Sequence, residues 1–172
     1  MTSTKEEITE RYLDAELKDY YMQDFQKLLL YEGNFWKLDK GTKDILIAIN
    51  KQQWIQTLYS QKCNPNDPCK SYLVFAYTKN SEPYIKSVLP KFIDKFNALI
   101  PSFTYYFFPP QENFNFKEDR TDDSKPACVR DKNYFKINHI QLTLDLIGSA
   151  ENIHDDFWND LAIYFTVDYL NL

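Results

Sequence analysis

Glycine is scarce in this sequence of 172 residues, which contains only Gly33, Gly41 and Gly148. Loops that hold nucleotide phosphates need several closely spaced glycines, so dinucleotide-binding and P-loop motifs are excluded. No apolar run reaches the roughly 18 residues that a membrane-spanning helix needs, and no membrane association is expected. The first residues are polar and acidic and do not resemble a secretory signal, so we expect a cytoplasmic location.

Histidine and cysteine are also few. A Ser/His/Asp or Cys/His catalytic arrangement would have to use His139 or His154, and the chain has no G-x-S-x-G motif. Cys63 and Cys69 flank a turn-rich loop and could close a small disulfide, whereas Cys128 stands alone. These spacings lack the tight cysteine pairs of zinc sites, so we expect reduced thiols, no metal and no cofactor. An enzyme is therefore the less favoured class.

Basic residues are absent from the end of the chain, because no lysine or arginine follows Lys136. The whole chain carries 20 basic and 25 acidic residues, a net charge of −5. This balance argues against nucleic-acid binding, which needs a basic patch. The acids that follow Lys136 are Asp145, Glu151, Asp155, Asp156, Asp160 and Asp168.

Apolar periodicity and aromatic or β-branched runs predict a single domain over residues 1–172. The predicted fold is α+β or α/β, with about four helices packed on a small mixed sheet of three or four strands. The strand–helix–strand unit in the middle of the chain has the length of a crossover, which favours parallel pairing of its two strands. Residues 111–132 form a long charged loop that is either functional or disordered. The predicted order is α-α-β-α-β-β-α, with helices over about residues 4–31, 42–61, 81–99 and 152–170 and strands over 71–78, 103–108 and 134–147.

The last predicted helix supplies the main candidate binding surface. Asp156 and Asp160 are four residues apart and share a helix face with Asp155 and Asn159. Such a face could attract a basic partner and speed its encounter. It could also be an ordinary solvated face, since acids near a helix N-terminus are favourable. Phe35 and Trp36 are candidate aromatic anchors.

These patterns predict a non-catalytic protein-binding module that masks or inhibits a basic protein partner, in the manner of an immunity protein or a phage-encoded antagonist. Two alternatives remain open. The first is a small enzyme or ligand-binding protein that uses His139 or His154 with an Asp. The second is a structural subunit of a larger complex, in which the many aromatic side chains would be buried against neighbouring chains.

Overall fold

The computed structural model describes residues 12–30, 38, 40–62, 70–97, 103–108, 137–144 and 153–168. The predicted loop 111–132, the anchors Phe35 and Trp36, and all three cysteines lie outside these residues. Within them the chain forms one α+β unit with four helices, one short 3-10 helix and four strands. The elements are α2 (Ala15–Leu30), α3 (Lys40–Asn50), β1 (Ile55–Gln61), β2 (Ser71–Tyr77), η1 (Lys79–Ser81), α4 (Glu82–Asn97), β3 (Phe103–Phe108), β4 (His139–Leu144) and α6 (Ile153–Phe165).

The sheet is antiparallel at every junction between the described strands. Its strand order is β1-β2-β4-β3, so β4 lies between the two strands that the sequence predicted to be parallel neighbours. The prediction of direct parallel pairing was therefore wrong. The helix α4 does carry the chain back across the sheet, so β2 and β3 run in the same direction, but both pair with β4 instead of with each other.

The predicted helix over residues 42–61 is also wrong in its second half. α3 ends at Asn50, and the chain turns into β1, which pairs with β2. The Asn50 side chain closes this turn, because its Oδ1 accepts the Thr57 backbone N–H at 2.8 Å and its Nδ2 donates to the Thr57 hydroxyl at 2.8 Å. Pairing with a buried neighbouring strand outweighs the helix-like spacing of Trp54, Ile55 and Leu58.

The helix predicted over residues 4–31 is interrupted at residues 12–14. Residues 12–14 are not helical, and the Leu13 backbone N–H donates to the carbonyl of Tyr77 at 2.9 Å. Asp14 caps the helix that follows, since its carboxylate accepts the backbone N–H of Leu17 at 2.8 Å. The start predicted for this helix, at about residue 4, lies outside the described residues.

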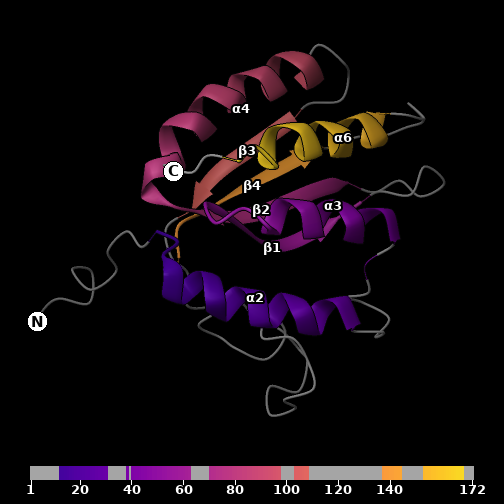
Figure 1. Cartoon of the computed structure of the whole chain (residues 1–172). Helices are drawn as coiled ribbons and strands as arrows, with labels where there is room; N and C mark the ends of the chain where they lie inside the picture. The colour runs from indigo at the N-terminus through magenta and orange to yellow at the C-terminus, as the bar shows by residue number, and fades with distance from the viewer. Residues whose placement is uncertain are drawn as a thin grey trace, which may run out of the picture.

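Two layers of helices enclose the sheet (Figure 1), with α4 and α6 on one side and α2 on the other. α3, α4 and α6 bury their apolar faces in the larger core cluster. Aromatic rings fill its centre, where Phe157 of α6 contacts Phe96 of α4 and Phe103 of β3, both with ring centroids 5.6 Å apart. On the other side, Leu13 and Tyr21 pack in a smaller cluster with Val74 and Ala76 of β2.

The alternation predicted for the last strand is confirmed. Ile140, Leu142 and Leu144 of β4 are fully buried in the larger cluster. Ile137, just before the strand, lies in the smaller cluster on the opposite side of the sheet. Because residues 137 and 140 are three positions apart, the regular alternation of a strand places them on opposite sides of the sheet, and β4 pairs with β2 and β3 without a shift in register.

Candidate functional site

Helix α6 forms because apolar residues recur every four positions along it. Ile153, Phe157, Leu161 and Phe165 are buried and fix the inner side of the helix on the sheet. Acidic residues occupy its first turn, where a negative charge offsets the partial positive charge of the helix N-terminus. The remaining positions form an outer face that carries most of the residues predicted to bind a partner.

Three of the four predicted polar residues of α6 are exposed, namely Asp155, Asp156 and Asn159. Asp155 forms an ion pair with Lys62, at 2.8 Å between carboxylate and ammonium. Asp156 makes no hydrogen bond or ion pair with the residues that the structure describes. The structure thus brings these three side chains together on one surface, with Lys62 partly neutralising it.

Asp160 lies elsewhere, in the seam between α6 and α4. Only 8% of this residue is exposed, and its carboxylate lies 2.9 Å from the ammonium of Lys95. The hydrogen bond to Asp160 raises the pKa of Lys95 above its usual value. Asp160 therefore joins two helices within the molecule and contributes little charge to the outer face of α6.

Sequence reasoning missed the exposed apolar residue of this face. Ile163 is 63% exposed, although isoleucine is usually buried. A signal was available, because Ile163 follows Leu161 by two positions and so points away from the buried stripe on a helix of 3.6 residues per turn. We define the outer face of α6 as Asp155, Asp156, Asn159 and Ile163.

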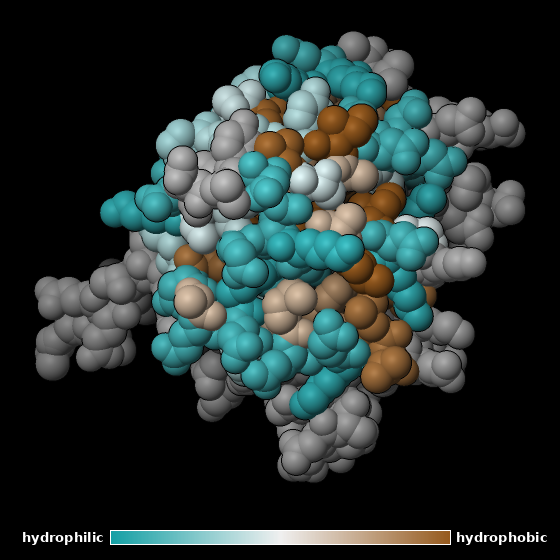
Figure 2. All heavy atoms as spheres, viewed as in Figure 1, coloured by the Kyte–Doolittle hydropathy of each residue, from teal (hydrophilic) through white to brown (hydrophobic). Residues whose placement is uncertain are grey.

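The neighbouring helix α4 presents lysines to solvent. Lys86, Lys91 and Lys95 are exposed along it. The ammonium of Lys91 lies 5.7 Å from the ring centroid of Tyr164 on α6, a cation–π contact across the seam. Figure 2 shows this face of the molecule as largely hydrophilic, with hydrophobic residues gathered in small patches between the helices.

Both histidines are internal side chains, each only 3% exposed. His139 donates through Nδ1 to the carbonyl of Ile137 at 2.8 Å, and burial lowers the pKa of its imidazole. The Nδ1 atom of His154 is hydrogen-bonded to the hydroxyl of Ser71, 2.7 Å away. Burial also lowers the pKa of His154. The negative charge of Asp155 raises this pKa, and the positive charge of Lys62 lowers it further. The Nδ1 atoms of the two imidazoles are therefore hydrogen-bonded to a carbonyl and to a hydroxyl.

A buried lysine on α2 is the second feature that the sequence did not reveal. Lys18 is 4% exposed, and its ammonium donates to the carbonyl of Asn50 at 2.9 Å and to that of Ile55 at 2.7 Å. Its two acceptors lie on either side of the turn between α3 and β1. Burial lowers the pKa of Lys18 to about 7.

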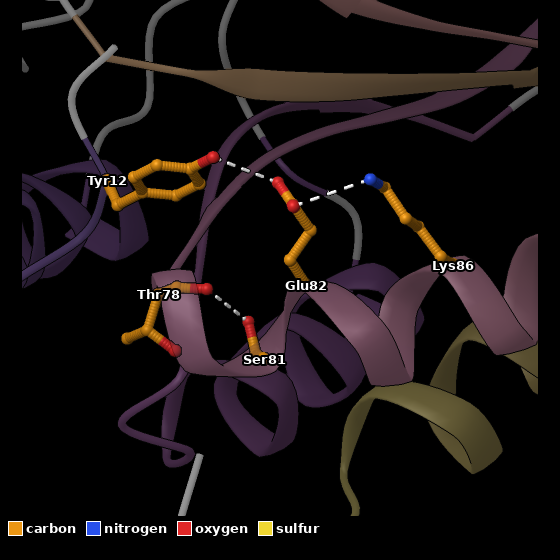
Figure 3. Close-up of polar contacts among 5 residues, drawn as sticks. All are labelled: Tyr12, Thr78, Ser81, Glu82 and Lys86. Atoms are coloured by element: carbon orange, nitrogen blue, oxygen red, sulfur yellow. Dashed lines mark hydrogen bonds and ion pairs between the residues drawn. The ribbon is translucent and has the colours of Figure 1, made fainter.

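A third polar group ties the start of the described chain to α4 (Figure 3). The Tyr12 hydroxyl donates to one carboxylate oxygen of Glu82 at 3.0 Å, and the Lys86 ammonium lies 3.4 Å from the other. Nearby, the Ser81 hydroxyl donates to the carbonyl of Thr78 at 2.7 Å. Glu82 stands in the first turn of α4, where its charge is favourable. These contacts explain how the chain is anchored on α4.

Among the residues that the structure describes, no three His, Cys, Asp or Glu side chains come together in a group that could hold a metal ion. In the same part of the chain, no helix is both long and apolar enough to cross a membrane.

No known protein family, curated protein or solved structure matches this chain.

Proposed function

We propose that this protein is a non-catalytic protein-binding module that masks a basic protein partner through the outer face of α6. The observation that carries the proposal is the combination of an exposed apolar side chain, Ile163, with exposed carboxylates on the same helix face. Protein interfaces commonly have an apolar centre within a polar rim, and a few side chains provide most of the binding energy. Opposite charges at the rim steer the partner and fix its register.

The charges of this face support a basic partner of modest affinity. Asp155 already pairs with Lys62, whereas Asp156 makes no hydrogen bond or ion pair with the described residues and acts on Lys95 through its charge alone. A basic side chain of the partner would bind Asp156 without displacing a hydrogen bond or ion pair of the described residues and would compete with Lys62 for Asp155. An immunity-like or antagonist-like role, in which the partner's own active or binding surface is covered, is the specific form of the proposal that we favour.

The alternative of an enzyme that uses His139 or His154 with an Asp has less support. Both imidazoles are buried, and Ser71, the hydroxyl bonded to His154, is fully buried as well. A nucleophile and its base must be within reach of a substrate. The hydrogen bond between Ser71 and His154 is therefore better explained as a structural contact that joins β2 to the start of α6.

The test is capture of a partner on the immobilised chain, from lysate of the source cells, at low and high salt. The variant Asp155→Asn/Asp156→Asn removes two carboxylates from the outer face of α6. The control Glu16→Gln/Asp19→Asn removes two carboxylates from exposed positions of α2, on the opposite side of the sheet. A second variant, Ile163→Ser, removes the apolar contact without a change in charge.

We expect a basic protein to be captured by the wild type and the α2 control, to be released at high salt, and to be lost with both α6 variants. Circular dichroism of each variant shows whether it is folded before capture. Equal capture by the wild type and both α6 variants, or capture of nothing by the wild type, would contradict the proposal.

A further inference from the structure

Helix α2 is held on the sheet by a side that is only partly apolar. Four residues of α2 are buried, and two of them, Lys18 and Asp24, carry charge. Of the other two, Phe25 lies in the larger core cluster and Tyr21 in the smaller one. A helix with few buried apolar side chains is a typical unit of local opening, in which one element leaves the fold while the rest stays intact.

The site of Lys18 suits a neutral amine better than an ammonium. The Lys18 nitrogen donates to the carbonyl of Asn50 at 2.9 Å and to that of Ile55 at 2.7 Å. An ammonium has three N–H groups, so one of them has no acceptor among the described residues. A neutral amine has two N–H groups, and the two carbonyls satisfy both. Closing α2 over a protonated Lys18 therefore buries a charge that is incompletely hydrogen-bonded, which is costly.

Within the described residues, no neighbouring charge changes this cost, because burial alone lowers the pKa of Lys18. Asp14, one turn earlier on α2, and Lys51, next to Asn50, are both exposed. Asp24 lies nearly two turns further along α2. The titratable groups of the smaller cluster are tyrosines, which are uncharged at neutral pH, namely Tyr21 of α2, Tyr59 of β1 and Tyr72 of β2.

A second polar group is left unsatisfied on the same side of the sheet. Gln56 is fully buried, and its Nε2 donates to the carbonyl of Thr57 at 3.2 Å, while its Oε1 has no hydrogen-bond partner among the described residues. Ile55 lies in the larger cluster, and side chains alternate along a strand, so Gln56 faces the α2 side. A buried acceptor without a partner costs free energy, which is regained when water reaches it.

The chain that leads into α2 is fixed by contacts of its own. The Leu13 backbone N–H donates to the carbonyl of Tyr77 at 2.9 Å, and the Tyr12 hydroxyl donates to the Glu82 carboxylate at 3.0 Å (Figure 3). None of these contacts involves a residue of α2. They can therefore persist while α2 lifts from the sheet.

We propose that α2 opens from the sheet as a unit, hinged at residues 12–14, and that the proton on Lys18 controls how often it opens. With the proton bound, the open form is favoured because water solvates the ammonium. After the proton is lost, the amine fits between its two carbonyls and α2 stays closed. Opening uncovers the apolar side chains of the smaller cluster that belong to the sheet, which are Leu58, Val74 and Ala76. This device lies on the side of the sheet opposite α6 and does not depend on the partner proposed above (Figure 1).

The direction and size of the effect follow from the two states of Lys18. Above about pH 7 the closed form releases the proton, whereas in the open form an exposed lysine keeps it up to a pH near 10.5. Each pH unit well inside this window lowers the open fraction by about tenfold. Between pH 7 and pH 9 the decrease is about 50-fold, because half of the closed form is still protonated at pH 7.

The test is hydrogen exchange of the backbone amides of the full chain, followed by mass spectrometry from pH 6 to pH 9. Exchange rates are divided by the intrinsic rates at each pH, and peptides from α2 are compared with peptides from the two central strands, β2 and β4. Lys18→Met removes the titrating group and keeps most of its volume. Gln56→Leu removes the unsatisfied oxygen. The matched control is Lys51→Met, which changes an exposed lysine next to the same turn.

We expect α2 to be less protected than β2 and β4 at pH 7. Its protection should rise by about 50-fold between pH 7 and pH 9 in the wild type and in Lys51→Met, and should not change with pH in Lys18→Met. Gln56→Leu should keep the response to pH and make α2 more protected at every pH.

Equal protection of α2 and the two central strands in the wild type would overturn the proposal, because α2 would then open only with the whole fold. A wild type whose α2 does not respond to pH, or a response that persists in Lys18→Met, would overturn the control by Lys18. The wild-type profile alone decides the first two points, so a variant that failed to fold would not protect the proposal.

Discussion

Lys18 should make this protein more stable as the pH rises through the neutral range. In the unfolded chain, an exposed lysine holds its proton up to a pH near 10.5, whereas burial lowers the pKa of Lys18 in the folded chain to about 7. Between these values the unfolded chain binds more protons than the folded chain. The free energy of unfolding must then increase with pH over this window.

The magnitude follows from the size of the shift. Each unit of pKa difference corresponds to about 1.4 kcal/mol, so the full window adds at most about 5 kcal/mol. The carbonyls of Asn50 and Ile55, at 2.9 and 2.7 Å, and the negative end of α3 favour the charged ammonium and oppose the effect of burial. Below pH 7 both states hold the proton, and Lys18 contributes no dependence on pH.

The assay is urea unfolding at intervals from pH 6 to pH 10, for the wild type and for Lys18→Met. Methionine keeps most of the side-chain volume and cannot titrate, so the difference between the two proteins isolates the contribution of Lys18. We expect the wild type to gain stability relative to the variant by about 3–5 kcal/mol between about pH 7 and pH 10. Parallel curves for the two proteins would refute the reasoning.

Three further predictions concern the core and the seam. Phe157→Ala should destabilise the fold by about 3–5 kcal/mol in chemical unfolding, because it opens a cavity among packed rings. Asp160→Ala and Lys95→Ala, combined in a double-mutant cycle, should give a coupling energy of about 0.5–1 kcal/mol, since the Lys95 side chain is 50% exposed. Acidification should lower the melting temperature from about pH 6.5 downwards, because the pKa of buried His154 is lowered and the unfolded chain takes up its proton first. His154→Gln should reduce that loss; an unchanged acid profile in this variant would argue against a role for the imidazole.

The sequence predicted well those elements whose own apolar pattern decides their structure. The apolar stripes of α4 and α6 and the alternation of β4 could be recognised in the sequence. In each of these elements the buried residues recur with the period of a helix or of a strand. β1 was mistaken for helix because Trp54, Ile55 and Leu58 are spaced as on one helix face, whereas in the structure Ile55 and Leu58 are buried in different clusters. Its pairing with β2 is a contact that no local pattern contains.

Only part of the candidate surface could be predicted, because local patterns do not show contacts between residues far apart in the chain. Acidic residues near the start of a helix identify an outer face, and Asp155, Asp156 and Asn159 do lie there. Asp160 shares their spacing, yet its burial depends on Lys95, a residue 65 positions away in the chain. Lys18 likewise gives no local sign of burial, because its acceptors are backbone carbonyls 32 and 37 positions away.

The most direct test of the proposed function is the association rate of the captured basic partner, measured against salt concentration. Stopped-flow mixing would compare the wild type with Asp155→Asn/Asp156→Asn and with the α2 control Glu16→Gln/Asp19→Asn. The account predicts that the α6 variant associates about tenfold more slowly at low salt and depends less on salt, while the control matches the wild type. Equal rates and equal salt dependence for all three proteins would contradict binding through the outer face of α6.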